Sequence, residues 1–96
     1  TVTQTLVASF AIATYGSGKF IIQAKNTVSS EVQVSELLVV HDGTTASATE
    51  YAIVHTGASP LATFDVDVSG GNVRLLATGA SANNTVYKIS ENLITV

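Results

Sequence analysis

The stretch LATFDVDVSGGNVRLLATG, residues 61–79, decides the fold. In residues 64–68 apolar Phe and Val alternate with Asp, and in residues 73–77 Val, Leu and Ala again fall on one face. Alternation with a period of two is typical of a strand that buries one face. Gly70-Gly71 lies between the two runs, and consecutive glycines supply the positive φ angles of a tight hairpin turn. The stretch therefore predicts an antiparallel β-hairpin.

The same pattern continues outward along the chain in both directions. Val, Ile and Thr are frequent, no ten-residue window carries a helical stripe, and turn residues recur about every 10–14 residues. Asp42-Gly43 predicts a second tight hairpin. Short connections favour antiparallel neighbours. We predict an all-β fold, a single antiparallel β-sandwich or flattened barrel that occupies residues 1–96 as one domain. Its seven strands are expected at residues 4–14, 19–26, 31–41, 45–56, 61–68, 73–79 and 85–95.

Two predicted strands do not alternate cleanly. In residues 31–35 polar residues hold the odd positions and valines the even ones, but in residues 37–40 both faces are apolar. We expect either a β-bulge near Ser35-Glu36 or a central strand covered on both sides. The last strand shows a similar break at Glu91-Asn92. In the first strand one face is expected to consist of Leu6, Ala8, Phe10 and Ile12.

Charged residues are scarce. They make up 11% of the 96 residues, where about 25% is usual, and four bases against seven acids leave a net charge of −3. This balance excludes the basic stripe of a nucleic-acid binder and a polybasic membrane contact. The longest apolar run spans residues 37–40, whereas a membrane helix needs about 20 residues. Without cysteine the chain forms no disulfide, thiolate zinc site or iron–sulfur cluster.

The outside of the domain is expected to be neutral. Positions outside the predicted core are mostly Thr, Ser, Ala, Asn and Gln, and the mean hydropathy is +0.39. Free-standing domains usually carry mixed charge on their surface. We therefore hypothesise that part of this surface is covered in a larger assembly, the alternative being a monomer with a neutral surface. The first residue is Thr1 and not Met, so we expect a processed chain, a module excised from a longer protein, or a chain that lacks its natural start.

Several segments resemble a known family. They are LVVHDGTT (38–45), TEYAIVHTG (49–57), LATFDVDV (61–68) and SGGNVRLLAT (69–78), preceded by KFIIQA (19–24). In order and spacing they resemble a β-rich module of virion structural proteins of tailed bacteriophages, especially those that infect marine cyanobacteria. The resemblance implies a structural role in the virion, with copies of itself and other virion proteins as partners. It implies no active-site signature, and it leaves head, neck, tail and fibre open.

The candidate catalytic and metal-binding residues favour structural interpretations. Neighbours on a strand point to opposite faces, so His41 and Asp42 cannot form the His–Asp pair of a serine triad, and Asp42 is interpreted as a turn residue. Asp65 and Asp67 share a strand face about 6–7 Å apart, but no third acid for calcium lies nearby in sequence. His41 and His55 lack further zinc ligands. We therefore predict no catalytic, cofactor or metal residue, and no enzyme.

The remaining candidates concern binding and register. The glycine segments 16–18 and 70–71 are not phosphate loops, because no Gly-Lys-Thr/Ser or helix follows them. An Arg74–Asp67 pair is predicted across the hairpin. The sequon at residues 83–85 is interpreted as a turn. The tyrosines are interpreted as packing residues at the core edge, with a sugar platform as the alternative. They are Tyr15, Tyr51 and Tyr87.

These observations together predict a structural component of a bacteriophage virion that acts through subunit contacts and forms homo-oligomers. Capsid decoration, neck, tail and fibre remain open. The alternatives are a receptor- or glycan-binding adhesion module on a fibre, with a host-surface glycan as ligand, and a cell-surface or fimbrial subunit. The tyrosines distinguish the first alternative, because a glycan platform requires them to form one exposed cluster.

Overall fold

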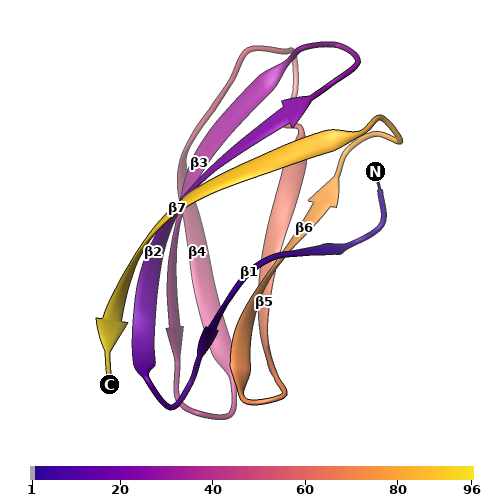
Figure 1. Ribbon diagram of the computed structural model, residues 1–96. Helices are drawn as coiled ribbons and strands as arrows, with labels where there is room; N and C mark the ends of the chain where they lie inside the picture. The colour runs from indigo at the N-terminus through magenta and orange to yellow at the C-terminus, as the bar shows by residue number, and fades with distance from the viewer. Residues whose placement is uncertain (1) are drawn as a thin grey trace.

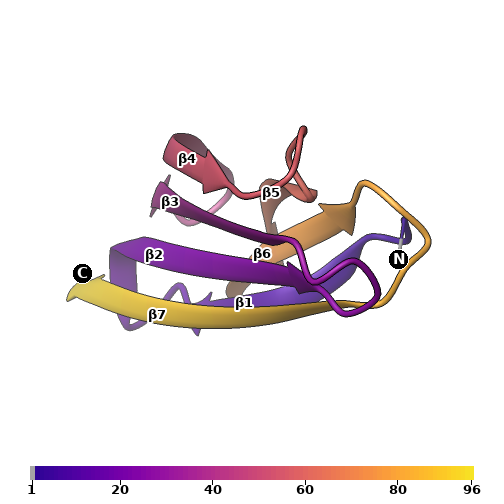
Figure 2. The same ribbon diagram turned by 90° about the horizontal axis from the view of Figure 1, so that it is seen from above.

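The computed structural model describes residues 2–96 and consists of two antiparallel β-sheets that pack as a sandwich (Figure 1). One sheet has three strands in the order β1-β6-β5, and the other has four in the order β4-β3-β2-β7. Figure 2 shows the whole molecule from above, with β4, β3, β2 and β7 following one another in this order. The predicted all-β sandwich of seven strands is confirmed for the described residues. The strands are β1 (Thr5–Ala11), β2 (Tyr15–Asn26), β3 (Val32–His41), β4 (Ala46–His55), β5 (Ala62–Ser69), β6 (Asn72–Gly79) and β7 (Thr85–Thr95).

The turn between β1 and β2 lies earlier in the sequence than predicted. The Thr14 amide donates to the Ala11 carbonyl at 3.2 Å, so the turn lies at residues 12–14 and not at 15–18. β2 therefore already begins at Tyr15. Because β7 supplies partners for this end of β2, the glycine-rich segment is extended, with Gly16 as the extra residue of a bulge.

The core lies between the sheets, on the faces that the alternation predicts for β2 and β6. Phe20 is 1% exposed and stacks on Phe10, with ring centroids 6.3 Å apart. Burial of apolar side chains is the main favourable term in folding. These two rings therefore join β1 of one sheet to β2 of the other. The buried cluster consists of Phe10, Phe20, Ile22, Leu37, Val39, Val73 and Leu75.

The irregular strand β3 keeps its phase, and the bulge lies in its neighbour β4. Val34 opposes Val54 and Glu36 opposes Tyr51, so β4 has one residue more than β3 in this interval. Ala52, which lies in this interval, adopts a positive φ of 53°. The bulge predicted near Ser35-Glu36 is therefore present in the β3–β4 ladder, but its extra residue belongs to β4 and not to β3. Among residues 2–96, a strand covered on both sides is also not observed. Gln33, Ser35, Leu37 and Val39 are buried, whereas the even-numbered valines and Leu38 lie on the outer side.

The expected face of β1 is correct for Ala8, Phe10 and Ile12 but wrong for Leu6, and the expected break in β7 is not found. In β1, Leu6 opposes Leu76 but Ala8 opposes Leu75, so Val7 is an extra residue. The bulge turns Leu6 outward, where it is 52% exposed, while Val7 and Ala8 pack against the core. In β7, no break occurs at residues 91–92. The register with β2 is continuous there, because β2 supplies a partner for every residue.

Gln33 forms hydrogen bonds to the segment through which the chain passes from β4 of one sheet to β5 of the other. This β3 side chain is 1% exposed and faces the chain that enters β5. Its Oε1 accepts hydrogen bonds from the amides of Leu61 and Ala62 at 2.5 and 3.3 Å, and its Nε2 donates to the Ala62 carbonyl at 3.3 Å. Buried backbone groups need such partners. One side chain therefore satisfies three of them where the chain changes sheets.

Candidate interaction surface

The outer side of the four-stranded sheet is the candidate interaction surface. Directly opposite residues of antiparallel strands share a face, so the register defines which side chains lie outside. We call this surface the four-strand face. It consists of Ser47, Thr49, Tyr51 and Val54 of β4, Val32, Val34, Glu36, Leu38 and Val40 of β3, Ser17, Lys19, Ile21, Gln23 and Lys25 of β2, and Val86, Lys88, Ser90, Asn92 and Ile94 of β7.

This face is rich in exposed large hydrophobic side chains. Leu38 is 52% and Ile94 63% exposed. On the outer side of the three-stranded sheet, by contrast, Leu6 is the exposed large hydrophobic residue within the described chain. Extended apolar patches on one side of a domain mark contact sites. The exposed large hydrophobic residues of the four-strand face are Ile21, Val34, Leu38, Val40, Tyr51, Val54, Val86 and Ile94.

Shallow grooves run over this face. One of about 420 Å³ lies over β2, β3 and β4, with Leu38, Val40 and Thr49 in its lining. Another of about 320 Å³ lies over β2, β3 and β7, lined in part by Ile21 and Val34. Grooves between side-chain rows accept the side chains of a second surface, so the face is suited to interdigitated packing.

The charges are distributed unequally over the molecule. All three lysines of the chain, Lys19, Lys25 and Lys88, lie on the four-strand face together with Glu36. This face therefore carries a formal +2, and Arg74 with the six other acids gives −5 for the rest of the chain. The Lys19 Nζ lies 3.4 Å from the Glu36 Oε1, and the hydrogen bond to Glu36 raises the pKa of Lys19.

His41 and Asp42 serve the β3–β4 turn. The Gly43 amide donates to the His41 Nδ1 at 2.9 Å, and the His41 Nε2 lies 2.6 Å from the Tyr15 carbonyl oxygen. One Asp42 carboxylate oxygen accepts from the amides of Thr45 and Thr44 at 2.8 and 2.9 Å. These bonds, with the Thr45 amide first, lower the pKa of Asp42. The structure therefore places Asp42 in the turn that the sequence predicts.

The two histidines are not brought together. His41 pairs with Ala46 at one end of the β3–β4 ladder, and His55 pairs with Gln33 at the other end. The His55 Nδ1 lies 2.8 Å from the Gly57 carbonyl oxygen. Within residues 2–96, no group of three or more His, Asp or Glu side chains is placed to hold a metal ion.

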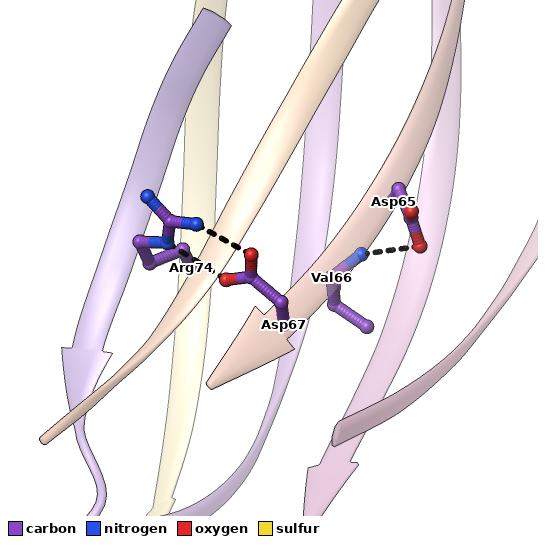
Figure 3. Close-up of polar contacts among 4 residues, drawn as sticks. All are labelled: Asp65, Val66, Asp67 and Arg74. Atoms are coloured by element: carbon purple, nitrogen blue, oxygen red, sulfur yellow. Dashed lines mark hydrogen bonds and ion pairs between the residues drawn. The ribbon is translucent and has the colours of Figure 1, made fainter. Parts of the chain in front are cut away.

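Asp65 and Asp67 have different partners (Figure 3). The predicted Arg74–Asp67 pair is formed, with the Arg74 Nε and Nη2 at 2.7 and 2.5 Å from the two carboxylate oxygens. Asp65 accepts from the Val66 amide at 2.8 Å. The hydrogen bonds from Arg74 lower the pKa of Asp67. The pair therefore joins neighbouring strands across the hairpin and fixes their register.

Removal of Arg74 is expected to return the pKa of Asp67 to its ordinary value. A carboxyl whose pKa is lowered in the folded state adds stability above its ordinary pKa, and this stability disappears as the pH falls through the folded-state pKa. In Arg74→Ala that acid dependence should disappear. An NMR titration of the Asp67 carboxyl carbon measures the shift directly. An unchanged Asp67 pKa in the variant contradicts the assignment.

The tyrosines lie in three different environments. Tyr51 is exposed on the four-strand face. Tyr15 packs edge-on against Phe10, and Tyr87 packs edge-on against Phe64, each with ring centroids 6.3 Å apart. Burial raises the pKa of Tyr87. The single exposed cluster that a sugar platform requires is therefore not formed by these residues.

The other candidate segments also have structural positions. Residues 16–18 belong to β2, and Gly70 and Gly71 form the β5–β6 turn with φ angles of 60° and 80°. Residues 83–84 of the sequon lie in the loop before β7. Sequence reasoning missed the four-strand face as a site, although residues 37–40, apolar on both faces, contained the signal.

The structure thus defines an all-β sandwich domain with one apolar broad face. Its fold is similar to part of the tailspike protein of Acinetobacter phage vB_ApiP_P1, known from a crystal structure. The TM-score is 0.58 and the sequence identity 17%, over 98% of this chain and 22% of the tailspike chain. The chain thus spans about one fifth of the tailspike's length, and at this identity the likeness concerns the fold.

No protein-family model matches the sequence, and no curated protein matches it significantly. Within the described part of the chain, no helix is long and apolar enough to span a membrane.

Proposed function

We propose that this chain is a structural module of a bacteriophage virion, in a tail or fibre, and that it acts through contacts between subunits. The observation that carries the proposal is the apolar four-strand face, which has no counterpart on the other broad side of the described domain. Faces of this kind become buried in assemblies. The similarity of the fold to a phage tailspike and the sequence resemblance to marine cyanophage virion modules support the same role.

We further propose that the domain has no catalytic role of its own. His41, Asp42 and Asp67, which the sequence offers as candidates for a reaction, form bonds within the fold. His41 bonds the backbone through both ring nitrogens, and Asp42 bonds turn amides. Asp67 is paired with Arg74. A nucleophile with an adjacent, oriented base, which hydrolysis requires, is not assembled from these residues.

A protein partner fits the four-strand face better than a glycan does. Glycan sites usually present flat aromatic rings, and Tyr51 is the aromatic residue among those that make up this face. The other exposed hydrophobic residues of the face are Val, Leu and Ile. An apolar core with a polar rim is typical of protein interfaces. We therefore propose subunit contact as the function of this face, with glycan binding as the second candidate.

Antibodies against the purified domain test the proposed location. Gold-labelled antibodies are applied to phage particles and to uninfected host cells and examined by electron microscopy. We expect label on the tail or its fibres and none on the cells. Label confined to the cell surface supports the fimbrial alternative and contradicts the proposal, as does the absence of label on particles.

A further inference from the structure

We infer that the four-strand face binds a second copy of this chain, face to face, about a two-fold axis parallel to the strands. The inference rests on the proposed function, because it names the partner in the subunit contact.

The size of the face fits a stable dimer. Four strands about 4.8 Å apart, each about ten residues long at about 3.3 Å per residue, give a flat area of about 500–600 Å². This area fits within the broad side of a molecule that measures 40 × 24 × 16 Å. The relief of the side chains increases the accessible area toward the roughly 800 Å² per partner of a standard interface. The face therefore approaches the size of a standard interface.

The two halves of the face differ in charge. The β3 and β4 half is aliphatic and contains Glu36, whereas the β2 and β7 half contains the three lysines. An axis parallel to the strands places β2 of one copy over β3 of the other and β7 over β4. Within one chain, Lys19 pairs with Leu38, which is the next outward-facing residue of β3 after Glu36. The axis places Lys19 over Leu38 of the second copy. Its ammonium therefore reaches Glu36 of the second copy as well as its own.

The alternative symmetric arrangement is disfavoured by charge. An axis that crosses the strands places each strand over its own copy. If it passes through the middle of β3, where Glu36 lies, Glu36 faces Glu36 across the interface. Like charges in close apposition are costly. The parallel axis instead forms a ring of four alternating charges from two Lys19 and two Glu36 side chains.

Lys25 and Lys88 lie toward one end of the face, and neither forms an ion pair within residues 2–96. Their long stems can cover apolar neighbours while the ammonium groups reach water at the rim. These lysines repel their symmetry mates in the dimer. Salt screens that repulsion and leaves the apolar contact intact, so the dimer should persist at high salt.

A mixing experiment tests this geometry. Lys19→Glu and Glu36→Lys are purified separately, and circular dichroism establishes that each variant folds. Each variant alone places like charges in the ring, so its dimer should dissociate about tenfold or more readily than the native one. In a one-to-one mixture, position 19 of each copy faces an opposite charge at position 36 of its partner. We expect the mixture to form a heterodimer by light scattering at a native dissociation constant.

The control is Thr63→Lys, an exposed position on the outer side of the three-stranded sheet, which should leave the native dimer unchanged. A mixture that remains monomeric overturns the inference, as does a native dimer in either single variant. A native chain that is monomeric also overturns it. If antibodies nevertheless label phage particles, the proposed function stands and the partner on this face is a different protein.

Discussion

Replacement of Gln33 by methionine is expected to destabilise the domain by about 3 kcal/mol or more. The substitution keeps the approximate length and volume of the side chain but removes its amide. The amides of Leu61 and Ala62 and the carbonyl of Ala62 then lose their partner at a buried position. Each buried polar group left unpaired costs about 1–3 kcal/mol. Chemical denaturation of Gln33→Met measures the loss as a lower midpoint.

Gln4→Met is the matched control. Gln4 is exposed and lies outside the strands, so the same chemical change there should alter stability by about 0.5 kcal/mol or less. Equal midpoints for the two variants contradict the role of Gln33 in holding the crossover. A loss of slope in the Gln33→Met transition instead indicates that the two sheets no longer unfold together.

Phe20→Ala is expected to destabilise the domain by about 3–5 kcal/mol. The Phe20 ring is 1% exposed and stacks on Phe10 of the opposite sheet. Truncation removes buried apolar surface and leaves a cavity between β1 and β2 that the rigid ladders cannot close. Urea denaturation at low protein concentration measures the effect on the isolated domain.

The adjacent position supplies the control for Phe20. Ile21 points to the four-strand face and is 40% exposed, so Ile21→Ala should cost about 1 kcal/mol or less. If the two alanine variants lose equal stability, the assignment of inner and outer faces on β2 is wrong.

The sequence predicts those features that depend on near neighbours in the chain. Alternation places Phe20 and Leu75 in the core, and the glycine turn fixes the register that brings Arg74 opposite Asp67. These features need no knowledge of distant strands, because a tight turn determines which residues face each other.

The bulges depend on distant partners and could not be predicted in the same way. Val7, Gly16 and Ala52 are extra residues only relative to β6, β7 and β3. Gln33 is similar, since its burial follows from the crossover that passes over it. A polar residue in an alternating strand predicts an exposed side chain unless its partner groups are known.

The four-strand face could not be predicted from the sequence for a related reason. Residues 37–40 are apolar on both faces, so the pattern cannot tell which side forms the core and which side is exposed. The three-stranded sheet packs against one side of β3. It buries Leu37 and Val39 and leaves Leu38 and Val40 outside. The second apolar side of β3 then becomes the centre of the four-strand face.

The central claim is that the four-strand face is the subunit contact, and two matched variants test it most directly. Leu38 on this face and Leu6 on the opposite broad side are both leucines with 52% exposure. The molar masses of the native chain, Leu38→Lys and Leu6→Lys are measured by light scattering at low and high salt. The account predicts an oligomer for the native chain and Leu6→Lys at both salts, and a monomer for Leu38→Lys. Equal masses for the two variants would contradict it.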